Sequence, residues 1–328
     1  MINFPNCNIL STDQFACTDI AQLFTAAAVV KPYAKRELQT NVLQGAILSN
    51  LFFEPSTRTR LSFSSAFKLL GGAVNETTEI STTSSVKGES LCDFAKVVAE
   101  YCDIAVIRHP DAGSAAKYAE CSNVPVINAG DGANEHPTQA LLDIYTMEQE
   151  LAKYDKTIDG VTLACIGDLK YGRTVHSLLK LLALFEDVTI HLISPMSLQL
   201  PKQFTEKLSE RGHRLEYFNR LEPGIENVDV LYVTRIQEER LSEVDQNNLQ
   251  LASFQINRTI YEQVCTPETV ILHPLPRNSR SDTPELHTDL NDHPNLAIFR
   301  QVANGLTVRM ALFALIMDVV EQISHTTY

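Results

Sequence analysis

The sequence has little positive charge and lacks the long apolar runs of membrane proteins. Of its 328 residues, 27 are Lys or Arg and 40 are Asp or Glu, so the formal net charge is −13. This balance argues against a general binder of nucleic acid or of anionic membranes. The apolar stretch near the C-terminus is interrupted by Arg309, Asp318 and Glu321, so it is too broken to cross a bilayer.

Signals for secretion and for metal binding are also missing. Residues 1–15 show no basic segment followed by an apolar core, which predicts that no secretory signal is present. The seven cysteines are scattered, and none are spaced as C-x-x-C: Cys7, Cys17, Cys92, Cys102, Cys121, Cys165 and Cys265. We therefore expect reduced thiols in a cytoplasmic protein rather than disulfides or a metal site, and we expect no cofactor.

The order of apolar segments predicts an α/β protein. A chain of this length, 44% hydrophobic and 20% charged, is long enough for two globular domains. Apolar strands that end in polar turns before helices are the repeat of a parallel sheet, so we expect two consecutive parallel α/β units. Strands are expected over 46–53, 103–107, 124–127, 161–166, 188–193, 228–233 and 270–272. Helices are expected over 12–30, 59–70, 91–101, 135–151, 174–185, 201–211, 248–264 and from 299 onward, with 73–90 as an exposed loop.

The corner between the first predicted strand and the helix 59–70 is a candidate anion site. Ser56, Thr57, Arg58 and Thr59 stand where unpaired backbone N–H groups and the helix dipole favour negative charge. The Arg58 guanidinium could hold a phosphate through two parallel hydrogen bonds. Serine and threonine are also common helix caps, so the corner alone favours phosphate only modestly over a plain N-cap.

Three further arginines stand at the ends of other predicted strands, namely Arg108, Arg173 and Arg235. Arg108 taken alone reads as an ordinary surface residue. Ligands of open α/β sheets bind beyond the carboxyl ends of the strands. Four arginines placed there in an acidic protein therefore indicate a polyanionic small molecule, or two anions, as ligand.

His136 and Gln139 lie three residues apart at a predicted helix start, so they share a face. An imidazole nitrogen could bond a carbonyl oxygen, and a glutamine amide oxygen could accept from an –NH₂ group. The pair suits a carbamoyl or amide substrate. A capping histidine beside a solvated glutamine is about equally consistent with these residues alone.

Two turns in the second half carry further polar groups. Residues 167–174 match a nucleotide-binding P-loop except that Arg173 stands where that motif needs lysine, so nucleotide hydrolysis is not favoured. Gln237 adds an amide near Arg235. The prolines in residues 273–277 would hold a rigid turn, which could be purely structural or could aim a backbone carbonyl at a ligand.

Taken together, these motifs resemble those of the carbamoyltransferase family. Residues 53–60 (FEPSTRTR) and 136–139 (HPTQ) resemble its carbamoyl-phosphate signatures. Residues 167–177, 234–237 and 273–277 look like the aspartate branch, whereas the ornithine branch would carry a cysteine at position 274, which is Pro274 here. The resemblance runs in order from about residue 8 to about residue 315.

The resemblance implies the reaction of carbamoyl phosphate with L-aspartate to give N-carbamoyl-L-aspartate and phosphate, the committed step of pyrimidine synthesis. It implies a carbamoyl-phosphate domain over 1–150, an aspartate domain over 151–290 and a C-terminal helix, 291–328, that returns to the first domain. The implied carbamoyl-phosphate residues are Ser56, Thr57, Arg58, Thr59, Ser84, Arg108, His136, Gln139, Pro274 and Leu275. The implied aspartate residues are Lys87, Arg173, Arg235 and Gln237, and the implied catalytic residues are Arg58, Thr59, Lys87, Arg108 and His136.

The family also implies an assembly. Its members supply a serine and a lysine from the loop near 81–90 to a neighbouring subunit, which implies at least a homotrimer with shared sites. Lys87 is the lysine here and Ser84 the chosen serine, with Thr83 and Ser85 as alternatives; the loop is one residue shorter than in members with two adjacent lysines. The resemblance further implies that Glu54 pairs with Arg173 and Arg240, and it leaves open whether a separate regulatory chain binds.

Three alternatives remain on sequence grounds. The acceptor amine could be another one, such as ornithine. Residues 167–174 could instead belong to a nucleotide-binding regulator. The chain could also be a catalytically silent subunit, although the presence of all the motif residues argues against this.

Overall fold

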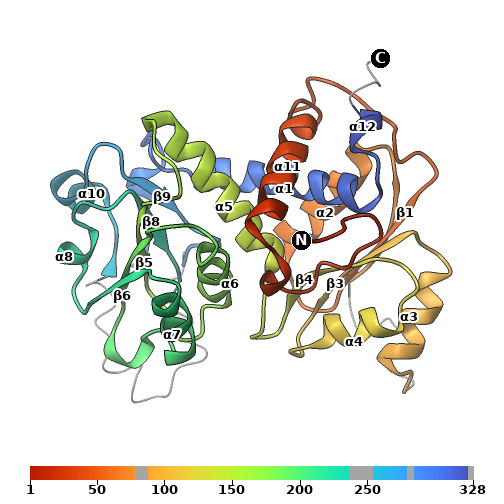
Figure 1. Cartoon of the computed structure of the whole chain (residues 1–328), viewed down its shortest axis with the longest axis horizontal. Helices are drawn as coiled ribbons and strands as arrows, with labels where there is room; N and C mark the ends of the chain where they lie inside the picture. The colour runs from red at the N-terminus through yellow and green to blue at the C-terminus, as the bar shows by residue number, and fades with distance from the viewer. Residues whose placement is uncertain (79–87, 236–253, 279–283, 324–328) are drawn as a thin grey trace. The chain divides into compact units, whose positions relative to one another are not determined.

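The computed structural model describes residues 1–78, 88–235, 254–278 and 284–323 (Figure 1). The chain divides into two compact units. The first comprises Met1–Leu142 and Ala303–Tyr328, and the second comprises Asp143–Val302. The chain leaves the first unit within helix α5 (Pro137–Leu151) and returns to it within helix α11 (Ile298–Ile316). Across the described ranges, no helix is both long and apolar enough to span a membrane.

The first unit contains a parallel sheet with the strand order β2-β1-β3-β4. Its strands are β1 (Ile47–Phe52), β2 (Ala73–Thr77), β3 (Ile104–His109) and β4 (Val126–Asp131). Its helices are α1 (Cys17–Ala34), α2 (Thr57–Leu69), α3 (Leu91–Ala99), α4 (Ser114–Cys121) and α12 (Val320–Ile323), with a 3₁₀ turn at Thr12–Gln14. The inner strands β1 and β3 are almost wholly buried, as expected for apolar strands covered on both faces.

Aromatic side chains pack α2 into the core of this unit. Phe63 and Phe67, four residues apart, present one helical face to the sheet and are fully buried. Both rings meet Phe313 of α11 edge to face, with centroid distances of 5.9 and 5.0 Å. Because α2 is fixed in this way, its N-terminus stays at the end of β1.

The second unit contains a parallel sheet with the order β7-β6-β5-β8-β9. Its strands are β5 (Thr162–Ile166), β6 (Thr189–Ile193), β7 (Arg214–Phe218), β8 (Val230–Val233) and β9 (Val270–Leu272). Its helices are α6 (Arg173–Leu182), α7 (Lys202–Glu210), α8 (Leu221–Ile225) and α10 (Arg258–Val264), with 3₁₀ turns at Ala152–Tyr154, Met196–Leu198 and Thr288–Leu290. The two parallel-sheet units confirm the predicted fold class.

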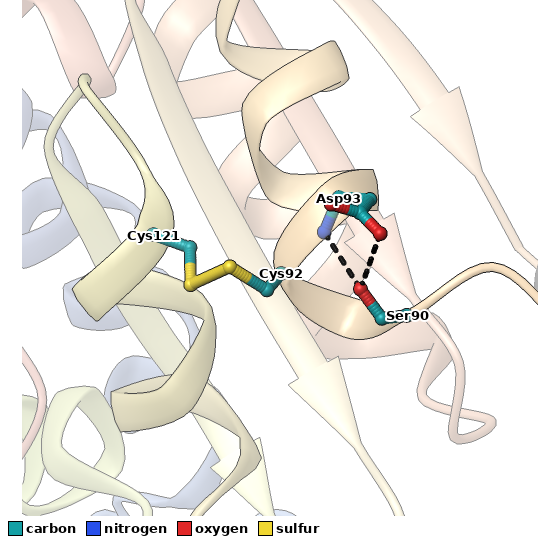
Figure 2. Close-up of a disulfide and its surroundings, with 4 residues drawn as sticks. All are labelled: Ser90, Cys92, Asp93 and Cys121. Atoms are coloured by element: carbon teal, nitrogen blue, oxygen red, sulfur yellow. Dashed lines mark hydrogen bonds between the residues drawn. A yellow bond between two sulfur atoms is a disulfide. The ribbon is translucent and has the colours of Figure 1, made fainter.

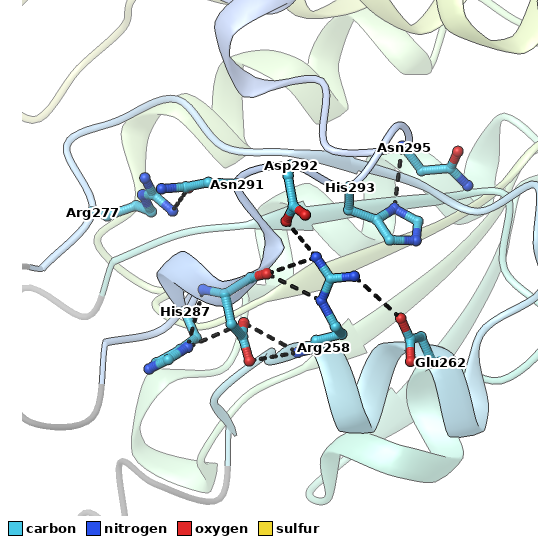
Figure 3. A network of polar contacts seen from close by, with 9 residues as sticks. Arg258, Glu262, Arg277, His287, Asn291, Asp292, His293 and Asn295 are labelled. Atoms are coloured by element: carbon cyan, nitrogen blue, oxygen red, sulfur yellow. Dashed lines mark hydrogen bonds and ion pairs between the residues drawn. The ribbon is translucent and has the colours of Figure 1, made fainter.

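Polar contacts hold the segment after residue 284 in the second unit (Figure 3). Arg258, the first residue of α10, donates to the backbone oxygen of Asp289 at 2.9 and 3.1 Å. It also pairs with Asp292 and with Glu262, one turn further along α10. This arginine therefore ties the start of α10 to the chain that leads into α11.

Some predicted element boundaries were wrong. Residues 73–77 were expected in a loop but form strand β2, and β7 and α8 were not predicted. Strand β3 extends through Arg108 and His109, which were expected beyond its end. Of the predicted helix 248–264, residues 258–264 form α10, residues 254–257 are described but not α-helical, with Ile256 in a β-bridge to Leu286, and 248–253 lie outside the described residues. Most of the predicted loop, 79–87, is likewise outside them.

The expectation that all cysteines are reduced was also wrong. Cys92 in the first turn of α3 and Cys121 at the end of α4 form a disulfide, with their Cα atoms 5.2 Å apart (Figure 2). The other five cysteines are thiols. No motif marks this pair, since 29 positions separate the two residues in sequence and only the packing of α3 on α4 brings them together.

Candidate functional site

The predicted anion corner forms at the junction of β1 and α2. Ser56 is the N-cap of α2 with an extended backbone (φ −161°), and its side chain makes no capping hydrogen bond. Arg58 is exposed on the first turn of α2, whereas Thr59 is buried. Since Ser56 does not cap the helix, its hydroxyl remains available beside the unpaired first-turn N–H groups, the arrangement that an anion needs.

The sheet order explains why this corner is a ligand site. The chain runs outward from β1 to β2 and then crosses to the other side of β1 to form β3, so the order reverses between β1 and β3. Their ends lie side by side: Phe52 is in register with Arg108, and the Phe53 N–H donates to the Arg108 carbonyl at 2.8 Å. Crevices at such reversals are where open α/β sheets bind ligands.

Arg108 is held firmly at this reversal. Only 8% of the residue is exposed. Its guanidinium lies 3.0 Å from a Glu54 carboxylate oxygen and donates to the backbone oxygen of Ala129 at 3.2 Å. A buried, oriented guanidinium costs little reorganisation when charge develops on a substrate. The pairing of Glu54 with Arg173 remains a prediction, and Arg240 lies outside the described residues.

His136 and Gln139 both lie within the same unit at the start of α5, and both are buried. Glu135 fixes the segment before them, because its carboxylate accepts from the Ser11 hydroxyl at 2.7 Å and from the Thr12 N–H at 2.7 Å. Asp131 fixes the preceding turn by accepting from the N–H of Gly113 and of Glu135. Sequence patterns carry no signal for these two acids, because the partners of Glu135 lie more than 120 positions away and Asp131 binds backbone N–H groups that no motif marks.

The second unit has an equivalent reversal between β5 and β8. Gly167 ends β5 with φ +111°, and a Cβ there would lie 2.3 Å from the Thr234 carbonyl oxygen at the end of β8. Gly167 therefore serves the close approach of two strand ends, which weakens the P-loop interpretation of this turn. Arg173 begins α6 and Arg235 follows Thr234, so both predicted arginines stand at this reversal, each partly buried.

The turn that contains Pro274 and Leu275 follows β9 and is braced by His273. The His273 ring accepts from the Leu275 N–H at 2.8 Å and lies 2.8 Å from Glu285 on its other nitrogen. Burial alone would raise the pKa of Glu285, but hydrogen bonds from His273 and the Asn278 N–H outweigh it, and the pKa is lowered. The Leu275–Pro276 peptide bond is cis.

A buried chain of hydrogen bonds continues from this turn. The backbone N–H of His273 donates to the side-chain oxygen of Gln301 at 3.0 Å. The side-chain amide of Gln301 in turn donates to the Asp143 carboxylate at 2.6 Å. Asp143 also accepts from the Tyr232 hydroxyl at 2.7 Å. Gln301 belongs to α11, Asp143 to α5 and Tyr232 to β8. These hydrogen bonds therefore link the turn at residues 274 and 275 to two helices and a strand.

The remaining predicted site residues cannot be placed, because they lie outside the described part of the chain. They are Thr83, Ser84, Ser85, Lys87, Gln237 and Arg240.

Comparison with known proteins gives matches over nearly the whole chain. The family model of the aspartate/ornithine carbamoyltransferase carbamoyl-P binding domain matches residues 8–149, and that of the Asp/Orn binding domain matches residues 159–316. The aspartate carbamoyltransferase catalytic subunit of Saccharophagus degradans is 53% identical over 322 residues, which cover 98% of this chain and 96% of that protein.

Solved structures are similar to a matching extent. The catalytic subunit of M. jannaschii aspartate transcarbamoylase has a TM-score of 0.86 at 41% identity, covering 95% of this chain and 98% of that one. The Trypanosoma cruzi aspartate transcarbamoylase in complex with carbamoyl phosphate and aspartate has a TM-score of 0.85 at 35% identity, covering 96% of each chain.

Proposed function

The chain belongs to the aspartate/ornithine carbamoyltransferase family, and from this premise we propose that it transfers the carbamoyl group of carbamoyl phosphate to L-aspartate. The products are N-carbamoyl-L-aspartate and phosphate, and the reaction is the committed step of de novo pyrimidine synthesis. The observation that carries the proposal is the placement of Arg58 and Arg108 at the reversal between β1 and β3. A relative of similar structure is known with both substrates bound.

The first domain, residues 1–150, is proposed to bind carbamoyl phosphate. Ser56, Thr57, Arg58 and Thr59 would hold the phosphate through hydroxyls, N–H groups and one guanidinium. Arg108 would bridge from the phosphate to the carbamoyl oxygen. The support is local: Arg108 is buried and fixed by Glu54, whereas Arg58 lies exposed on the first turn of α2, where an incoming anion meets it first.

The chemistry follows from where charge develops. The amine of aspartate attacks the carbamoyl carbon, and negative charge builds on the carbamoyl oxygen. Thr59, Arg108 and His136 would stabilise that charge as preorganised donors. When the tetrahedral species collapses, the C–O bond to phosphate breaks, and the leaving phosphate takes the proton from the amine.

The amide end and the second substrate need other groups. Gln139 and the backbone at Pro274 and Leu275 are proposed to bind the carbamoyl –NH₂. In the second domain, residues 151–290, Arg173 and Arg235 would bind the two aspartate carboxylates, helped by Gln237 and Lys87. The position of both arginines at the reversal between β5 and β8 supports this role.

The assembly is proposed to be a cytoplasmic homotrimer in which Ser84 and Lys87 of one subunit enter the site of the next. The C-terminal segment, 291–328, would return to the first domain. A separate regulatory chain could bind to such a trimer. The sharing of sites between subunits rests on the family resemblance of the 81–90 loop.

Substrate choice tests the proposal directly. With labelled carbamoyl phosphate, the purified chain should form N-carbamoyl-L-aspartate and show no turnover of L-ornithine above background. Turnover of ornithine without turnover of aspartate would assign the chain to the other branch of the family.

Loss of Arg58 tests the anion corner. Arg58→Ala removes a charge that balances the phosphate, so kcat should fall by about a hundredfold or more. Arg60→Ala is the matched control on the same helix, because Arg60 pairs instead with Glu76 at 2.7 Å. A loss below about threefold in Arg58→Ala would contradict the assigned role, given the usual cost of removing such a donor.

A further inference from the structure

A buried carboxylate that the proposed reaction does not use lies in the second unit. Asp143 of α5 is completely buried, and its two oxygens accept hydrogen bonds from different side chains. Oδ1 accepts from the Gln301 amide of α11 at 2.6 Å, and Oδ2 accepts from the Tyr232 hydroxyl of β8 at 2.7 Å. Because burying a charge is costly even with such partners, stability alone is a weak reason for a carboxylate at this position.

One branch of hydrogen bonds runs from Oδ1 to the turn after β9. The backbone N–H of His273 donates to the Gln301 side-chain oxygen, so the –NH₂ group of Gln301 faces Asp143. The His273 ring accepts from the Leu275 N–H at 2.8 Å. This branch therefore ends at the backbone of Pro274 and Leu275, the groups proposed to bind the carbamoyl –NH₂.

A second branch runs from Oδ2 to the start of α6. The Tyr232 hydroxyl, which donates to Asp143, also accepts a hydrogen bond from the Thr174 side chain. Burial raises the pKa of Tyr232 and Asp143 adds to the shift, so the hydroxyl keeps the proton that it donates. Thr174 follows Arg173 in the first turn of α6. This branch therefore ends beside a group that is proposed to bind an aspartate carboxylate.

We propose that Asp143 is a positioning residue that holds the carbamoyl-binding turn and the start of α6 in a fixed relative position. It touches neither substrate, and it acts through Gln301 on one branch and through Tyr232 on the other. The inference rests on the proposed function, because that function assigns the ends of the two branches to different substrates. Such a connection matters because a small displacement of binding groups can cost much of the rate.

The direction of each hydrogen bond explains why the central residue is an acid. The His273 N–H can only donate, so the –NH₂ group of Gln301 must meet an acceptor. The Tyr232 hydroxyl accepts from Thr174, so its own proton must meet an acceptor as well. Aspartate supplies both acceptors, whereas asparagine supplies one acceptor and one –NH₂ group. In Asp143→Asn the oxygen must face Gln301, so only the branch through Tyr232 is reversed.

Steady-state kinetics of full-length variants separate the two branches. Tyr232→Phe removes one hydroxyl and keeps the ring. The KM for aspartate should therefore rise about fivefold to tenfold, while the KM for carbamoyl phosphate changes by less than about twofold. Gln301→Met should show the opposite split. Asp143→Asn should resemble Tyr232→Phe, whereas Asp143→Ala, which cuts both branches, should raise both constants.

Tyr154→Phe is the matched control. The Tyr154 hydroxyl lies in the same unit and donates to Asn295 at 3.0 Å, outside both branches, so its loss should leave both KM values unchanged. A general loss of stability, which thermal unfolding measures, would not separate the two constants. Tyr232→Phe and Asp143→Asn are nearly isosteric, so they keep the test decisive if a more disruptive variant does not fold.

Two results would count against different claims. Equal shifts of both KM values in Tyr232→Phe and Asp143→Asn, or parent-like values in both variants, would overturn the positioning role of Asp143. A parent protein that forms no N-carbamoyl-L-aspartate would instead overturn the proposed function.

Discussion

Buried hydrogen bonds, rather than the motif residues themselves, fix the geometry of the candidate site. Arg108 owes its orientation to Glu54 and to the Ala129 carbonyl. The turn at Leu275 owes its shape to His273, which Glu285 orients from 12 residues further along the chain. Such supporting contacts make a site rigid, and a rigid site is what electrostatic stabilisation of a transition state requires.

Removing the support of His273 should therefore affect substrate binding. Glu285→Ala leaves the ring without its carboxylate partner and loosens the turn at Pro274 and Leu275. We expect KM for carbamoyl phosphate to rise by about tenfold, since a small misplacement of binding groups can cost this much. Glu285→Gln, which can still hydrogen-bond the ring, should recover most of the affinity. Steady-state kinetics of both variants test this, and equal KM values in all three proteins would refute it.

His109 should make the first unit sensitive to acid. Burial lowers its pKa below the ordinary value of 6.5, so between the two values the unfolded chain binds a proton that the folded chain does not. Stability therefore rises with pH in this window and is lost as the pH falls below about 6.5. Protonation would also break the hydrogen bond that Nδ1 accepts from the Asp111 N–H.

Urea unfolding between pH 7 and pH 5 measures this effect. The free energy of unfolding should fall with decreasing pH in the parent protein, and it should fall less in His109→Gln. The comparison of slopes isolates His109 from other titrating groups, among them His176, whose pKa burial also lowers. Identical slopes in the two proteins would contradict the prediction.

Motif residues could be predicted from the sequence, but their supports could not. Ser56, Thr59 and Arg108 follow an apolar strand or lie at its end, so their place at a sheet edge follows from local pattern. Asp131 and Glu135 carry no such pattern. Glu135 acts on residues more than 120 positions away, a pairing that only the folded chain defines.

At the scale of elements, the two missed strands, β2 and β7, each form one edge of their sheet. Strands β2 and β7 each pair on one side only, and their residues are largely exposed or half-buried. An edge strand in contact with water needs no apolar run. The polar sequence of Ala73–Thr77 therefore predicted a loop instead of a strand. The inner strands β1, β3, β5, β6 and β8 are mostly buried, and their apolar runs made them predictable.

The disulfide between α3 and α4 is an element-scale feature with a measurable cost of removal. It closes a loop of 29 residues, and on the chain-entropy model its loss costs about 3.6 kcal/mol. The packing of α3 is modest, because Ala95 is its one fully buried residue while Leu91, Phe94 and Val98 are partly buried, so we expect the disulfide to contribute to holding this helix. Cys92→Ser should thus lower the midpoint of thermal unfolding by about 6–10 °C.

A reductant provides the control for this prediction. The parent protein should lose a similar amount of stability when the disulfide is reduced, whereas Cys92→Ser should show no further loss. Mass spectrometry after alkylation, with and without reductant, counts the thiols that the disulfide protects. If reduction leaves the parent midpoint unchanged, the link does not stabilise α3.

At the scale of the whole molecule, both units use one plan. In each, the first strand lies inside the sheet, the chain runs to one edge, and it then crosses over to the other side. Arg58 and Arg108 lie at the reversal between β1 and β3, and Arg173 and Arg235 lie at the reversal between β5 and β8. The protein as a whole nevertheless carries a net charge of −13. Positive charge is therefore concentrated where two anionic substrates are proposed to bind, while the acidic remainder disfavours nonspecific anions.

The proposed sharing of sites between subunits makes a quantitative prediction for mixtures of inactive variants. Arg58→Ala and Lys87→Ala should each be nearly inactive alone. If the Lys87 of one subunit serves the site of the next, a mixed trimer contains some sites with both residues intact. Random reassembly of equal amounts should restore about a quarter of the parent activity, because each of the two positions is correctly filled half of the time.

A second mixture serves as the control. Arg58→Ala and Arg108→Ala alter residues that lie at one reversal of one unit, so every site in their mixed trimers lacks one of the two arginines. This pair should regain no activity after the same dissociation and reassembly. Recovery in the first mixture and not in the second would require that Lys87 act across a subunit boundary. Failure of the first mixture to recover, with trimers present by size measurement, would place Lys87 in its own subunit's site.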